Sequence, residues 1–114
     1  MYEYKIKKVL KVYDGDTITV EIDLGCFTTV TKVVRLLGID TPEVRGDERP
    51  EGLVARDYLR NWLDEAIRAD TDIIIRTHLD KTGKYGRLLG ELFINNISVN
   101  EHLIREGYAT VYGE

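Results

Sequence analysis

The stretch Val33-Val34-Arg35-Leu36-Leu37-Gly38-Ile39-Asp40-Thr41-Pro42-Glu43 combines the pattern of a buried β-strand with three charged side chains. Its run of Val, Leu and Ile is typical of a strand in a protein core. Thr-Pro ends that strand, because proline lacks the N–H group that would continue the hydrogen-bonded ladder. Charged side chains are seldom buried without a partner. Arg35, Asp40 and Glu43 therefore either pair with one another or face a site that binds a charged molecule.

Length and composition predict a single globular domain, residues 1–114. The chain has 114 residues, of which 43% are hydrophobic and 32% charged, a balance that argues against disorder. Its formal net charge of −4 makes a nucleic-acid partner less expected but leaves room for a local basic cleft. Cys26 is the single cysteine, so no internal disulfide can form. No signal peptide or membrane-spanning run is recognisable, and we expect a cytoplasmic monomer with no membrane partner.

The segment before residue 33 predicts two strands of a meander that the opening stretch completes. Residues 4–13 carry apolar positions at Ile6, Val9, Leu10 and Val12 between lysines, which predicts a strand with one wet face. Asp14-Gly15-Asp16-Thr17 is a turn signal, and residues 18–22 alternate cleanly as the second strand of a hairpin. After a turn at residues 23–25, a β-branched run from Thr28 leads into the third strand.

The segment after residue 43 predicts two helices and two further strands. Pro50 and Glu51 mark a helix start. The helix continues to about Arg68, with an apolar stripe that places Trp62 in the core. Its apolar positions are Ala55, Leu59, Trp62, Leu63, Ala66 and Ile67. Strands follow at residues 73–75 and 88–94, and the capping box at residues 98–101 begins a short helix that Gly107 ends. Five strands with one long helix and one short C-terminal helix predict a β-barrel with helices (α+β), of the five-stranded OB type.

Three segments combine turn residues with charge: Asp14-Gly15-Asp16-Thr17, residues 35–43, and Lys84-Tyr85-Gly86-Arg87. Carboxylates bind hard cations such as Ca²⁺ or Mg²⁺, and the guanidinium group binds phosphate in a bidentate manner. Each segment alone has a plainer interpretation. The first is a common hairpin turn, and a phosphatase-type aspartyl nucleophile would need a parallel βαβ sheet; the last is a common solvated loop. The two histidines, His78 and His102, lack partners at ligand spacing, so we assign them no role.

Taken together, the three segments resemble those of the staphylococcal (micrococcal) nuclease family, the thermonucleases, and the tail from Val99 to Gly107 is also similar. The resemblance covers nearly the whole chain. It implies a five-stranded OB barrel with packed helices, and Ca²⁺-dependent hydrolysis of phosphodiester bonds in DNA and/or RNA. The products expected for the family carry 3′-phosphate and 5′-hydroxyl ends.

The resemblance also implies a metal site. Asp16 and Asp40 resemble the carboxylate ligands of Ca²⁺, and the backbone carbonyl of Thr41 resembles a third ligand. Asp14 lies where the family has a further carboxylate next to these ligands. The chain departs from the family in its longer hairpin between Asp16 and Arg35. The loop after Glu43 also differs, and family members commonly continue into a further helix beyond the position of Glu114.

For catalysis, the resemblance implies that Glu43 is the general base for the attacking water. Arg35 and Arg87 match the arginines that hold the scissile phosphate. The residues that resemble substrate-contacting positions of the family are Lys84, Tyr85 and Tyr112.

Two non-enzymatic alternatives remain open. The first is a non-catalytic OB module that binds single-stranded nucleic acid or a protein partner. The second is a structural domain stabilised by Ca²⁺. The first would be favoured by loss of Glu43, Arg35 or an acidic ligand, and none is lost. The structural-domain hypothesis does not explain Arg35 and Arg87, because a positive side chain next to a metal ion is repelled by it unless an anion lies between them.

Overall fold

The structure is a computed structural model that describes residues 2–78 and 88–112. The strands are β1 (Tyr2–Asp14), β2 (Thr17–Gly25), β3 (Thr28–Leu36), β4 (Ile39–Asp40), β5 (Ile73–His78), β6 (Leu88–Ile94), β7 (Ile97–Ser98) and β8 (Thr110–Val111). The helices are the 3-10 helix η1 (Gly46–Glu48), α1 (Arg49–Arg68) and α2 (Val99–Arg105). The predicted loop at residues 80–87 lies outside the described residues.

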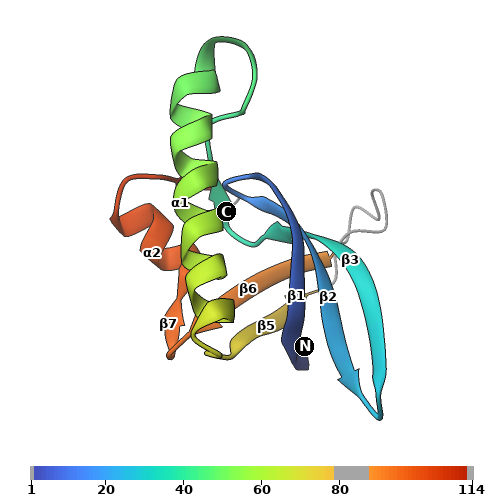
Figure 1. Ribbon diagram of the computed structural model, residues 1–114. Helices are drawn as coiled ribbons and strands as arrows, with labels where there is room; N and C mark the ends of the chain where they lie inside the picture. The colour runs from blue at the N-terminus through green and yellow to red at the C-terminus, as the bar shows by residue number, and fades with distance from the viewer. Residues whose placement is uncertain (1, 79–87, 113–114) are drawn as a thin grey trace.

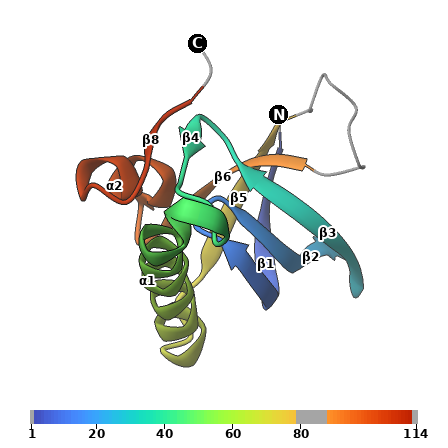
Figure 2. The ribbon, with the colours of Figure 1, turned by 90° about the horizontal axis from the view of Figure 1, so that it is seen from above.

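A closed barrel forms the centre of the fold. β1, β2 and β3 make the predicted antiparallel meander. β5 pairs with both β1 and β6. Parallel pairing of β3 with β6, with Val34 opposite Leu88, closes the sheet (Figure 1). Seen from above, α1 and α2 lie on one flank of the barrel, and the β2–β3 hairpin projects on another (Figure 2). The predicted five-stranded OB-type barrel with one long and one short helix is confirmed.

The core fills the barrel and continues under both helices. Inward positions of β2 alternate strictly with outward ones, as the sequence pattern predicts. The apolar side chains that show no exposed surface are Ile18, Val20, Val34, Leu36, Leu59, Leu63, Ile75, Leu92, Val99 and Leu103. Among the described residues, neither helix has the length and apolarity that a membrane span requires.

Two predictions about single strands need correction. The apolar run from Val33 to Ile39 is not one strand, because Leu37 and Gly38 turn between β3 and β4. Gly38 has φ +81°, a conformation that glycine adopts without steric cost. Leu10 was predicted on the inner face of β1 but is 53% exposed. Register shifts along β1 account for this, since each extra residue moves the following side chains to the opposite face.

The apolar stripe of α1 also differs from its prediction at two positions. Ile67 is exposed. Trp62 is half-buried and packs edge-on against His102 of α2, with ring centroids 4.6 Å apart, rather than entering the barrel core. Tyr58 stacks on Tyr108 and shares a 2.7 Å hydrogen bond with His102. Trp62 therefore joins the two helices to each other, and His102 is a packing residue.

Candidate functional site

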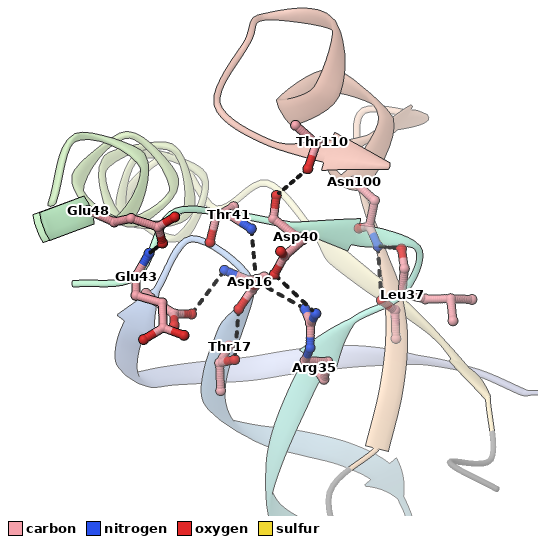
Figure 3. A network of polar contacts seen from close by, with 12 residues as sticks. Asp16, Thr17, Arg35, Leu37, Asp40, Thr41, Glu43, Glu48, Asn100 and Thr110 are labelled. Atoms are coloured by element: carbon pink, nitrogen blue, oxygen red, sulfur yellow. Dashed lines mark hydrogen bonds and ion pairs between the residues drawn. The ribbon is translucent and has the colours of Figure 1, made fainter. Parts of the chain in front are cut away.

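Three charged side chains from three different segments meet at one end of the barrel. Asp16 lies in the turn between β1 and β2, Arg35 is near the end of β3, and Asp40 is in β4. Arg35 Nη1 is 3.1 Å from Asp16 Oδ2, and its Nη2 is 3.6 Å from Asp40 Oδ1. Figure 3 shows both carboxylates directed at the Arg35 guanidinium group. The structure thus brings Arg35 and Asp40 of residues 33–43 together with Asp16 of the Asp14–Thr17 turn.

Asp16 is only 5% exposed, and both its carboxylate and its backbone carbonyl accept hydrogen bonds. Its carboxylate accepts hydrogen bonds from the Thr41 N–H and the Thr17 hydroxyl, each at 3.0 Å. Its own carbonyl accepts the N–H of Leu36 at 2.8 Å. Burial acts to raise the pKa of Asp16, but hydrogen bonds from Asp14 and the Thr41 N–H and the charge of Arg35 outweigh it and lower the pKa. Asp16 therefore stays ionised at neutral pH.

Asp14 and Asp40 both lie close enough to Asp16 to be affected by its charge. Burial, together with the hydrogen bond and charge of Asp16, raises the pKa of Asp14 to about 7. Burial and the charge of Asp16 also raise the pKa of Asp40, although Arg35 opposes this. Asp14 and Asp40 thus each lie near the buried Asp16, and among the described residues Arg35 is the cation that contacts Asp16 and Asp40. A further cation at this end of the barrel would relieve their mutual repulsion.

We expect the raised pKa of Asp14 to make stability depend on pH. Its carboxyl group titrates near 3.8 when unperturbed and at about 7 in the fold, so the folded state binds the extra proton. The free energy of unfolding should therefore fall as pH rises from about 4 to about 7 in chelator. Asp14→Asn, which imitates the protonated carboxyl group, should remove that part of the fall and be more stable than the parent at about pH 8. Urea denaturation at low and high pH measures the difference.

Asp23→Asn, at the far end of the same hairpin, controls for the loss of one carboxylate. Asp40 contributes to the pH dependence in the same direction, so the comparison between variant and parent, rather than the slope of either, isolates Asp14. Parallel curves for the parent and Asp14→Asn would show that Asp14 does not hold the extra proton.

The donors around Asp16 fit a hard divalent cation such as Ca²⁺. Ca²⁺ prefers carboxylate, carbonyl and water oxygens, and Asp16 and Asp40 supply carboxylates beside the Thr41 backbone. The hydroxyl oxygen of Thr41 is buried without a hydrogen-bond partner among the described residues. Among residues 2–78 and 88–112, no three His, Cys, Asp or Glu side chains converge as a metal site. The protein would therefore provide few ligands itself, and water or substrate oxygens would have to supply the others.

Glu43 lies in the loop after β4, with an exposed side chain. Its N–H donates a 3.0 Å hydrogen bond to Glu48 Oε1, which closes the loop on itself (Figure 3). Gly52 of α1 packs against the same loop so closely that a Cβ atom there would lie 2.1 Å from the Glu43 carbonyl oxygen. Glu43 borders a cavity of about 200 Å³ whose lining residues are Tyr13, Asp14, Glu43, Val44 and Arg45. The backbone that carries Glu43 is therefore fixed from two directions.

The remaining predicted site residues fall into two groups. Tyr112 reaches the site: the Arg35 Cζ atom is 5.1 Å from the Tyr112 ring centroid, and the Tyr112 N–H donates to the Gly38 carbonyl at 2.9 Å. Lys84, Tyr85 and Arg87 lie outside the described residues.

Sequence reasoning missed the supporting role of Asn100. This side chain is 3% exposed and comes from α2. Its Nδ2 donates to the carbonyls of Leu37 at 2.8 Å and Gly90 at 3.1 Å, and its Oδ1 accepts the N–H of Leu92 at 3.2 Å. Asn100 thereby ties α2 to the turn between Arg35 and Asp40 (Figure 3). A polar residue between the buried Val99 and Leu103 was the available signal, but a capping box explained it locally.

Replacing Asn100 by leucine should lower the free energy of unfolding by about 2–4 kcal/mol, because buried backbone groups lose their partners. Urea denaturation measures this loss. Asn61→Ala on the exposed face of α1 is the control and should stay within about 0.5 kcal/mol of the parent. A similar small effect for Asn100→Leu would mean that these three hydrogen bonds contribute little.

Similar proteins point to one family. Residues 33–114 match the family described as staphylococcal nuclease homologue. The chain is 36% identical over 131 residues to an uncharacterized protein of Methanocaldococcus jannaschii, covering 97% of this chain and 61% of that protein. It is 34% identical over 107 residues to a thermonuclease of Staphylococcus hyicus, covering 90% of this chain and 56% of that protein. It is 30% identical over 108 residues to the endonuclease YncB of Bacillus subtilis, covering 89% of this chain and 45% of that protein.

The chain thus spans about half the length of the curated relatives it matches. The family match covers β4, both helices and the C-terminal strands, together with the part of β3 that carries Arg35. On this match the chain belongs to the staphylococcal nuclease homologue family.

Proposed function

We propose that the chain, as a single domain, is a Ca²⁺-dependent nuclease that hydrolyses phosphodiester bonds of DNA and/or RNA to 3′-phosphate and 5′-hydroxyl ends. The observation that carries the proposal is the convergence of Asp16, Arg35 and Asp40 at the end of the barrel where the Glu43 loop begins. The relatives whose names include thermonuclease or endonuclease support it.

Arg35 is suited to hold the scissile phosphate. Its side chain is 14% exposed, and its Nη1 lies near Asp16 without forming a well-directed hydrogen bond to any acceptor in the described residues. Nη1 itself is buried beside Asp16, so a non-bridging phosphate oxygen would be contacted by the exposed part of the guanidinium group or after that group turns away from the carboxylates. Because the guanidinium group is charged at all ordinary pH values, its bonds strengthen as negative charge builds on the phosphorus centre. Arg87 is proposed as its partner on the leaving-group side, with Lys84, Tyr85 and Tyr112 contacting the rest of the substrate.

Glu43 is proposed as the general base. Its exposed carboxylate can accept one proton from the attacking water while the oxygen of that water forms the new bond to phosphorus. The bond to the 5′ oxygen then breaks, and solvent supplies its proton. When bound by Asp16, Asp40 and the Thr41 carbonyl, Ca²⁺ would supply positive charge to a non-bridging oxygen and order the attacking water.

Incubating a supercoiled plasmid with the protein, in Ca²⁺ and in chelator, tests the proposal. We expect nicking and linearisation only with Ca²⁺. A labelled oligonucleotide should give an upstream fragment that a polymerase extends only after phosphatase treatment, as a 3′-phosphate requires. Binding of the oligonucleotide without cleavage would favour the non-catalytic OB module. A Ca²⁺-dependent gain in stability without binding of nucleic acid would favour the structural domain.

We expect Ca²⁺ to raise the melting temperature, because a ligand that binds only the folded state stabilises it. At a concentration ten times the dissociation constant the gain is about 1.4 kcal/mol, or several degrees for a domain of this size. Asp40→Asn should abolish the gain by removing one carboxylate ligand. Thermal denaturation with and without Ca²⁺ measures both. Asp64→Asn, on the exposed face of α1, is the charge-matched control and should keep the full gain; a parent protein that does not respond to millimolar Ca²⁺ would contradict the metal assignment.

A further inference from the structure

One exposed tyrosine near the Glu43 loop contacts two cations, Arg45 and Lys11. The Arg45 guanidinium group, from the loop before η1, donates a hydrogen bond to the hydroxyl of Tyr13 at the end of β1. The ammonium group of Lys11, on the same strand, lies 5.3 Å from the centroid of the Tyr13 ring. Lys11 and Arg45 are both exposed, and Tyr13 is 37% exposed. Segments far apart in sequence thus place two positive charges around one ring.

Arg45 and the tyrosine that joins it to Lys11 border the same cavity as the proposed general base. Tyr13 and Arg45 line the cavity of about 200 Å³ next to Asp14 and Glu43. The charge of Glu43 helps to raise the pKa of Arg45, although the Tyr13 contact is the larger cause. A molecule that reaches Glu43 from this side therefore meets Arg45 as well.

The charges that surround Lys11 and Arg45 indicate that these two cations are placed to bind an anion. The chain carries a net charge of −4, and Asp14, Asp16 and Asp40 gather at the same end of the barrel. Arg35 is engaged by Asp16 and Asp40. In the described part of the chain, by contrast, Arg45 forms no ion pair with a carboxylate, and its partner is the neutral phenol of Tyr13. Two like charges held against one ring repel each other unless an anion joins them.

We infer that Lys11 and Arg45 form a subsite for a phosphate group of the substrate strand, next to the scissile one. This inference rests on the proposed function, since it adds a contact for the same polynucleotide. Tyr13 is a positioning residue: its hydroxyl orients Arg45, and its ring holds Lys11 nearby. Phosphate is the ligand class because the guanidinium group offers a planar pair of donors and the ammonium group a mobile point charge.

The experiment measures binding of a labelled single-stranded DNA oligonucleotide by fluorescence anisotropy, in chelator so that no cleavage occurs, over a series of salt concentrations. Arg45→Ala and Lys11→Ala should each weaken binding roughly three- to tenfold, as loss of one exposed phosphate contact implies. Each should also reduce the slope of log K against log salt by about 0.7. Lys7→Ala, an exposed lysine earlier on β1, is the matched control for loss of one positive charge. In Ca²⁺, the cleavage defect of the two variants should fall mainly on KM.

Tyr13→Phe separates positioning from packing. It keeps the ring that Lys11 contacts but removes the hydroxyl that accepts from Arg45, so it should lose the Arg45 share of affinity and salt dependence and retain the Lys11 share. A merely structural role for Tyr13 would leave the salt slope unchanged.

The outcomes distinguish this subsite from the proposed function. If the plasmid is cleaved but Arg45→Ala and Lys11→Ala bind like Lys7→Ala, the subsite is wrong and the nuclease proposal stands. If the plasmid is not cleaved yet the two variants lose affinity selectively, the subsite stands and the proposed catalysis fails. A parent protein that neither binds nor cleaves overturns both.

Discussion

Replacing Glu43 by glutamine should lower kcat for phosphodiester cleavage by a factor on the order of 10²–10⁴, the usual contribution of a general base. Glutamine keeps the size and the hydrogen-bonding capacity of the side chain but cannot accept a proton from water. The backbone should stay in place, because the Glu43 N–H bond to Glu48 and the close packing of Gly52 do not involve the Glu43 carboxylate. The defect should therefore fall on turnover, measured with a labelled oligonucleotide at saturating Ca²⁺.

Binding measurements show whether the loss is chemical. Glu43 is not proposed as a metal ligand, so the Ca²⁺-dependent rise in melting temperature should persist in Glu43→Gln. Glu65→Gln, on the exposed face of α1, controls for the loss of one carboxylate and should cleave like the parent. Cleavage by Glu43→Gln at the parent rate would reduce Glu43 to a loop residue.

What the sequence predicted well depended on neighbouring residues. The β1–β2 hairpin, the start of α1 next to Pro50 and the capping box at Ser98 all follow from local rules of turn geometry, proline placement and capping. The Ser98 hydroxyl does accept the Glu101 N–H, at 3.2 Å. Each signal is contained in a few consecutive residues, so no knowledge of distant contacts was needed.

Long-range pairing was harder to predict because the sequence pattern does not encode it. Parallel pairing of β3 with β6 closes the barrel, and pairing of β4 with β8 brings Tyr112 next to Arg35. Neither partner can be chosen from periodicity alone. The register shifts in β1 were likewise not predictable from periodicity, and they left Leu10 exposed.

Within the candidate site, the convergence of Asp16 with Arg35 and Asp40 was expected only when three segments were considered together and matched to a family. Tyr13 and Arg45 were overlooked because they are 32 residues apart and neither belongs to a recognised motif. The sequence analysis assigned no role to Gly52, although a glycine within a helix costs about 1 kcal/mol relative to alanine. Its use becomes visible only when the Glu43 loop packs against it. The catalytic and metal-binding roles themselves stay predictions.

Arg35→Gln should separate two roles of one cation and produce opposite changes in cleavage and in Ca²⁺ binding. Cleavage should fall by a factor on the order of 10²–10³, because a charged donor to the phosphate oxygens is lost. Without metal, the variant should also be less stable by about 3 kcal/mol, since Asp16 remains buried with no cation beside it.

Ca²⁺ binding in the absence of nucleic acid should become tighter in the same variant. Arg35 lies 3.1 Å from an Asp16 oxygen and 3.6 Å from an Asp40 oxygen, so it competes with a metal for those carboxylates. A unit charge at ~4 Å interacts with about 4 kcal/mol at an effective dielectric constant of ~20, so a gain of about tenfold in affinity is a modest expectation. Calorimetric titration with Ca²⁺ and melting curves with and without the metal measure this gain. Arg60→Gln, a charge-matched change on α1, should alter neither. Weaker Ca²⁺ binding by Arg35→Gln would mean that the arginine orients the carboxylates for the metal rather than competing with it. Tighter Ca²⁺ binding together with lost cleavage would mean that Arg35 releases Asp16 and Asp40 when metal and phosphate bind together.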